Sequence, residues 1–155
     1  MTIKAVFWNT DSIYGTDSER AVLKTAVELF AAQQFNQVAL SPRSAADLTN
    51  GLEKAGINNR MVLKMDGESA AARNQSPKID ASTLSETLGS LNSMRVVAKA
   101  PVVNADEVIV ITNTREDARV ALKAGMQAMC VEGQMDSTNF AHFIIDALAK
   151  NAPRP

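Results

Sequence analysis

Three apolar runs in the chain end in side chains that could take part in chemistry. Each run is followed by an amide, a carboxylate or a hydroxyl group, at Asn9 and Asp11, at Ser41, and at Thr112 with Asn113. Groups of these kinds can bind a divalent cation or a phosphoryl group, and an aspartate beside an acid can act as a nucleophile. Whether these groups meet depends on the elements that carry them.

Short apolar runs alternate with amphipathic segments over the whole chain. We expect strands at 3–8, 37–40, 60–65, 107–112 and 128–131, and helices at 17–35, 44–56, 78–92, 115–126 and 137–151. Segment 93–106 fits an extra short strand with a loop, although Pro101 disfavours a central strand. The alternation predicts the α/β class, a three-layer α/β/α sandwich with a mostly parallel sheet.

Parallel strands joined by helices bring their carboxyl ends to one edge of the sheet, where ligands of such folds bind. The polar residues that end the strands are therefore expected to lie along one edge. We expect a single domain over residues 1–150 and a flexible tail at 151–155.

Composition excludes several classes of protein. The 155 residues carry 16 basic and 17 acidic side chains without a long run of one charge, so we expect no nucleic-acid partner. No apolar run approaches the roughly 20 residues that cross a bilayer, so we expect no membrane partner. The single cysteine, Cys130, cannot form an internal disulfide and fits a buried position. These features are typical of a cytoplasmic protein.

The order of the motifs resembles the haloacid dehalogenase (HAD)-like superfamily of phosphatases and phosphotransferases. The stretch "AVFWNTDSIY" is similar to the first motif of the family, with Asn9 in place of the nucleophile and Asp11 in place of the acid/base. Ser41 in "VALSPRS" matches the second motif, whose hydroxyl hydrogen-bonds the transferred phosphoryl group. Lys78 in "SPKIDASTL" matches the lysine of the third motif.

The fourth motif carries the strongest resemblance, in "DEVIVITNTREDARVALKAGM". Thr112 and Asn113 stand where the family has Gly-Asp, and Asp117 keeps its place. The resemblance implies a phosphate site at Ser41 and Lys78 and a metal site at Asp11, Asn113 and Asp117.

The departures from the family pattern bear on catalysis. Asn9 has no anionic oxygen to attack phosphorus, and Asn113 removes a second charge from the metal site. We therefore expect no catalytic residue at Asn9 and Asp11, a metal site that is weak or absent, and no cofactor. The connections before Ser41 and before Lys78 are also too short for a cap domain.

The resulting prediction is a catalytically inactive, capless HAD-like domain that acts by binding a protein partner or its own copies and retains at most a weak anion site. An apolar rim at Trp8, Ile13 and Tyr14 is the expected contact surface. The alternative is an atypical phosphohydrolase of the same superfamily, with magnesium as its cofactor, so enzymatic activity stays open with inactivity favoured.

Structural roles compete with these assignments. Asn9 can form an Asx turn, and Ser41 can end its strand in a turn. Asp117 can cap its helix or form a local salt bridge, for example toward Arg115 or near Lys123. Asp11 can have a structural role in its loop, and Lys78 can be an ordinary solvent-exposed lysine. A phosphate-receiving signalling domain would use Asp66 after the third strand but lacks its acid pair at "WNTD". A dinucleotide-binding domain lacks its glycine-rich turn.

Overall fold

Five parallel strands form the central sheet of the computed structural model, which describes residues 3–9, 17–66, 80–112, 114–131 and 146. In chain order the strands are β1 (Ala5–Asn9), β2 (Asn36–Leu40), β3 (Leu63–Met65), β4 (Val108–Thr112) and β5 (Gln127–Cys130). Their spatial order is β3-β2-β1-β4-β5, with every neighbouring pair parallel. The predicted α/β class with a parallel sheet is confirmed.

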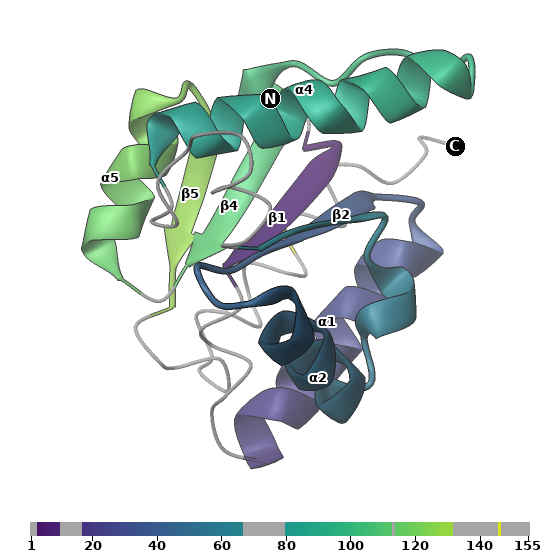
Figure 1. Cartoon of the computed structure of the whole chain (residues 1–155), viewed down its shortest axis with the longest axis vertical. Coiled ribbons are helices and arrows are strands. Elements are labelled where there is room, and N and C mark those ends of the chain that lie inside the picture. The colour runs from purple at the N-terminus through teal and green to yellow at the C-terminus, as the bar shows by residue number, and fades with distance from the viewer. Residues whose placement is uncertain (1–2, 10–16, 67–79, 113, 132–145, 147–155) are drawn as a thin grey trace.

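Helices cover both faces of this sheet. They are α1 (Asp17–Ala32), α2 (Ala45–Ala55), α4 (Ala81–Val97) and α5 (Arg115–Lys123), with short 3-10 turns η2 (Asn58–Arg60) and η3 (Ala105–Glu107). Figure 1 shows α1 and α2 on one side of the sheet and α4 and α5 on the other. The three predicted layers are thus present. The expected helix at 137–151 and the tail at 151–155 lie outside the described ranges, apart from residue 146.

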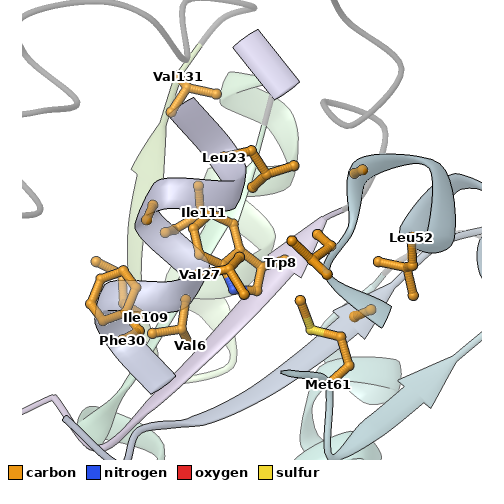
Figure 2. Close-up of a cluster of buried hydrophobic side chains, with 14 of the residues drawn as sticks. Val6, Trp8, Leu23, Val27, Phe30, Leu52, Met61, Ile109, Ile111 and Val131 are labelled. Carbon is orange, nitrogen blue, oxygen red and sulfur yellow. The ribbon is translucent and has the colours of Figure 1, made fainter. Parts of the chain in front are cut away.

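Strand β1 contributes to two hydrophobic cores because successive side chains point to opposite faces. Val6 and Trp8 belong to the core beneath α1 and α2, whereas Ala5 and Phe7 belong to the core beneath α4 and α5. Figure 2 shows the first core, where Trp8 lies against α1. All five residues of β1 are buried, and β1 is the middle strand of the sheet.

The buried indole of Trp8 is held by a polar side chain inside the first core. Its Nε1–H donates to Oε1 of Gln37 at 2.9 Å, and Nε2 of Gln37 donates to the carbonyl of Val27 in α1 at 3.0 Å. Gln37 is completely buried. Because a buried N–H without an acceptor is costly, Gln37 makes a buried tryptophan possible here and links β1 and β2 to α1 by hydrogen bonds.

The helix ends agree with the residue types that cap them. Ser44 accepts a hydrogen bond from the Asp47 N–H at the start of α2, as predicted. Gly56 and Gly125 follow α2 and α5 with φ of 76° and 79°, a left-handed conformation that glycine adopts without a Cβ penalty.

The extra short strand considered for segment 93–106, which the sequence left ambiguous, is not formed. Helix α4 continues to Val97, and the chain then runs extended to η3 without joining the sheet. The Asn92 side chain takes the hydrogen bonds that a strand partner would supply: its Nδ2 donates to the Val103 carbonyl at 2.9 Å, and its Oδ1 accepts from the Val103 N–H at 2.7 Å. The strand expected at 60–65 is shorter, because its first residue belongs to η2.

We predict that Gln37→Leu lowers the free energy of unfolding by about 1–3 kcal/mol, because it removes the acceptor that Gln37 offers to the buried indole N–H of Trp8. Urea unfolding measures this loss. The double variant Trp8→Phe/Gln37→Leu removes donor and acceptor together and should lose less than the sum of the single variants. Strict additivity would show that the hydrogen bond does not hold this core.

Candidate functional site

Four buried polar residues end neighbouring strands at the carboxyl edge of the sheet. In spatial order they are Asp66 after β3, Ser41 after β2, Asn9 at the end of β1 and Thr112 at the end of β4. Their exposed fractions are 7%, 3%, 2% and 0%. Strands lie about 4.8 Å apart, so neighbouring members of this row are close enough to share a ligand. The predicted gathering of Asn9, Ser41 and Thr112 at one edge is confirmed.

The centre of this row lies where the strand order reverses. Strands β2 and β3 extend to one side of β1, while β4 and β5 extend to the other. Helical connections therefore leave β1 and β4 toward opposite faces, which opens the crevice where ligands bind in folds of this type. Asn9 ends the first of these two strands and Thr112 ends the second.

Asn9 is joined across this crevice to Asp117 at the start of α5. Its Nδ2–H donates to Oδ2 of Asp117 at 2.9 Å, although the two residues are 108 positions apart in the chain. The carboxylate can only accept, so the amide nitrogen of Asn9 must face it. Trp8 points into the core beneath α1, and alternation along β1 therefore directs Asn9 to the face that carries α5.

The turn from β4 into α5 places Asp117. Thr114 is the N-cap, and its Oγ1 accepts from the Asp117 N–H at 3.2 Å. Thr112 steadies the turn, since its Oγ1 accepts from the Thr114 N–H at 3.3 Å. Asp117 thus lies in the first helical turn, where a negative charge is favourable. The described contact of the Asp117 carboxylate is thus the long-range hydrogen bond from Asn9, which the local structural role considered for Asp117 does not include.

Ser41 ends β2 in a tight turn. Its N–H donates to the Met65 carbonyl at 3.0 Å, and its Oγ accepts from the Arg43 N–H at 3.1 Å. The turn role considered for Ser41 is therefore present. Within the described part of the chain the hydroxyl hydrogen has no acceptor, so it can still donate to an anion at this edge.

Other predicted site residues cannot be placed. Asp11, Lys78 and Asn113 lie outside the described residues, so their predicted roles stay predictions. The same holds for Ile13 and Tyr14 of the predicted contact rim. Trp8, the third member of that rim, is only 1% exposed, and its assignment to a surface is wrong because the indole fills the core beneath α1.

The described acids do not by themselves form a metal centre. Among residues 3–9, 17–66, 80–112 and 114–131, no cluster of three or more His, Cys, Asp or Glu side chains could hold a metal ion. Asp117 presents one carboxylate oxygen to an amide N–H of Asn9, a donor that would repel a cation at that oxygen. This pair therefore fits magnesium poorly in its observed arrangement.

Asp66 follows β3, as the signalling-domain alternative requires, but the sheet order excludes that alternative. A phosphate-receiving domain of the flavodoxin-like type has the order 2-1-3-4-5, which puts its third strand next to the first. Here β3 is the edge strand beyond β2, so Asp66 and Asn9 are separated by Ser41. The row of buried residues nevertheless includes Asp66. From the sequence, Asp66 is considered only as the acceptor of a phosphate-receiving signalling domain.

Comparison with known proteins supports the fold. An uncharacterized protein from Corynebacterium glutamicum ATCC 13032 Kitasato, solved by crystallography at 1.44 Å, matches with a TM-score of 0.58 and 12% identity over 99% of this chain and 98% of its own. The core domain of a candidate phosphoglycolate phosphatase from Streptococcus pneumoniae TIGR4, solved by NMR, matches with a TM-score of 0.60 and 12% identity over 94% and 97% of the two chains. At this identity the likeness concerns the fold.

No protein-family model and no curated protein sequence matches the chain. In the described residues no helix is long and apolar enough to cross a membrane.

We predict a measurable coupling between Asn9 and Asp117. Asn9→Ala and Asp117→Ala should each lower the free energy of unfolding by about 1–2 kcal/mol, since each removes a partly buried hydrogen bond to a charged group. The double variant should lose about 1 kcal/mol less than the sum. Glu53→Ala on the remote helix α2 is the control, and its effect should add to that of Asn9→Ala. If the effects of Asn9→Ala and Asp117→Ala also add, the coupling is contradicted.

Proposed function

We propose that this protein is a capless HAD-like domain that has lost phosphoryl-transfer activity and acts by binding another protein or a second copy of itself. The hydrogen bond between Asn9 and Asp117 is the observation that carries the proposal. It occupies the position where the HAD-like resemblance implies a nucleophile and a metal-binding acid.

The chemistry of this pair differs from that of two carboxylates. Two aspartates facing each other at hydrogen-bonding distance repel, and a bound cation relieves the repulsion. An amide donor opposite an acid needs no cation, because its N–H supplies the positive charge density. The Asn9–Asp117 pair, at 2.9 Å, is therefore stable without metal. The same amide is a poor nucleophile toward phosphorus, so the arrangement favours a structural link over covalent catalysis.

Absence of a cap is part of the proposal. Residues 17–65 contain only α1, β2, α2, η2 and β3. The segments 10–16 and 67–79 are both far shorter than the roughly 50 residues of a small independent domain. A site without a cap stays open to water, which weakens electrostatic catalysis and leaves the carboxyl edge accessible to a large partner.

Exposed apolar side chains support a binding role. Near the end of α4 and in the loop after it, large apolar residues are between 46% and 85% exposed: Met94, Val96, Val97 and Val102. Single exposed apolar residues are common, but four within nine positions form a patch of the kind that protein partners cover. This patch replaces Trp8 as the described surface on which association can be tested.

The alternative is an atypical magnesium-dependent phosphohydrolase. The hydroxyl hydrogen of Ser41 favours it, since a buried donor without an acceptor in the described chain could bind a phosphoryl oxygen. The likeness to the core domain of a candidate phosphoglycolate phosphatase also favours it. Catalysis by this route would need an acid and a lysine from the positions of Asp11 and Lys78.

Restoring the acids of the motifs tests the proposal. We predict negligible hydrolysis of an aryl phosphate by the parent, little gain from Asn9→Asp or Asn113→Asp alone, and a magnesium-dependent gain in the double variant. Asn9→Asp alone should cost on the order of 1 kcal/mol of stability at neutral pH, since it replaces a donor with a second anion. The neighbouring charge raises the pKa of the introduced carboxyl, so its stability deficit should grow as pH rises from 4 to 7.

The parent protein is the decisive control for this series. Magnesium-dependent turnover by the parent, abolished by Asp11→Asn, would favour the phosphohydrolase over the binding domain. A saturable magnesium isotherm with micromolar affinity would argue in the same direction, because the proposed site binds the ion no tighter than on the order of millimolar.

Association is tested at the apolar patch. We predict that Val97→Lys weakens concentration-dependent self-association or partner binding in analytical ultracentrifugation, because it places a charge on the most exposed valine of the patch. Leu122→Lys is the matched control, since Leu122 on α5 is 62% exposed and outside the patch. Equal effects of the two variants would show that the patch is not the contact surface.

A further inference from the structure

A second polar site lies at the opposite edge of the sheet, where the strands begin. A surface pocket with a volume of about 240 Å³ is lined by Ile3, Lys4, Gln33, Gln34, Phe35, Asn36 and Arg95. Lys4 lies five residues before Asn9, so the pocket is about 16 Å from the carboxyl edge at 3.3 Å per strand residue. The volume equals that of about eight water molecules in the liquid, enough for a small ligand.

The pocket is rich in hydrogen-bonding groups that the protein does not use. The side-chain amides of Gln33, Gln34 and Asn36 have no hydrogen-bond partner among the described residues. The Nε–H of Arg95 donates to the Pro101 carbonyl, which fixes the direction of the guanidinium. Its two terminal nitrogens have no acceptor in the described chain, which leaves four donors for a ligand.

The charge available to a ligand comes from Arg95. Lys4 is already paired, since its Nζ lies 2.9 Å from Oε2 of Glu107. The Asn104 backbone N–H and then the Lys4 ammonium bind the Glu107 carboxylate and lower its pKa, so this acid stays ionised and continues to neutralise Lys4. Arg95 has no acidic partner in the described chain. The pocket therefore combines one uncompensated cation with three amides.

Gln34 occupies a strained backbone position at the pocket. The Phe35 N–H donates to the Phe30 carbonyl and the Gln34 N–H to the Ala31 carbonyl, so Gln34 takes the left-handed position that closes α1, with φ of 62°. The equivalent positions after α2 and α5 are the glycines Gly56 and Gly125. Lys99 takes the same conformation after α4, with φ of 59°, so the case for Gln34 rests on its place in the pocket lining.

We propose that this pocket binds a small molecule through its phosphate or carboxylate group, held by the terminal nitrogens of Arg95 and by the amides of Gln33, Gln34 and Asn36. A guanidinium binds either oxyanion through paired hydrogen bonds. The negative ends of α1 and α4 face this edge with about half a charge each, but backbone N–H groups after the helices already donate to the carbonyls of residues 29–31 and 94–96. The full charge of Arg95 therefore dominates at short range. The site does not involve the carboxyl edge, but Arg95 lies between Met94 and Val96 of the apolar patch, so anion binding and association are measured separately.

The test is an NMR titration of ¹⁵N-labelled full-length protein with sodium phosphate and, separately, sodium citrate, each against sodium chloride at equal ionic strength. One probe should give saturable shifts at the amides of residues 33–36 and Arg95, and the tighter probe identifies the anionic group. Arg95→Gln should weaken binding at least tenfold. Arg119→Gln on α5, which removes the same charge outside the pocket, should leave the affinity unchanged.

Gln34→Gly separates a binding role from a structural role. Relief of the left-handed strain should raise the thermal midpoint by about 2–4 °C, while loss of the amide weakens anion binding severalfold. A purely structural residue would show the first effect without the second. The proposal is overturned if neither probe saturates, if Arg95→Gln and Arg119→Gln act equally, if Gln34→Gly binds as tightly as the parent, or if the shifts cluster at Asn9 and Ser41.

Discussion

The hydrogen bond between Trp8 and Gln37 constrains the structure more than any other single contact described. It lets the largest side chain of the protein lie inside the core beneath α1, and the second bond from Gln37 to the Val27 carbonyl holds that helix over β1 and β2. With Trp8 fixed to one face, the alternation of β1 sends Asn9 to the other face, where α5 begins. The orientation of the candidate site thus follows from a residue that takes no part in it.

Much of this fold could be predicted from local patterns. Ser44, Gly56 and Gly125 mark helix ends through interactions within a few residues, and the apolar run of β4 needs burial on both faces. Segment 93–106 could not be predicted, because two hydrogen bonds from Asn92 decide its path. The family resemblance puts Asn9 and Asp117 at one site, but the direct hydrogen bond between these residues, 108 positions apart, could not be predicted from the sequence.

The two edges of the sheet differ in the way they treat polar groups. At the carboxyl edge the neutral amide of Asn9 donates a hydrogen bond to the Asp117 carboxylate, so this acid has a partner within the protein. At the amino edge Lys4 is neutralised by Glu107, whereas Arg95 is left to solvent or to a ligand. A shared fold at 12% identity to other proteins constrains neither arrangement, since the layers need only the apolar faces of the strands.

The central place of β1 has a consequence for synthesis on the ribosome. One edge of β1 pairs with β2, which follows it closely, but the other edge pairs with β4, which starts at Val108. Until Val108 has emerged, the buried strand β1 therefore has one row of unpaired N–H and C=O groups. Such an edge can pair with another nascent chain, and its closure by distant residues is slow. The pairing of β1 with β4 is thus the step that closes the middle of the described sheet, and it comes after β2 and β3 have been made.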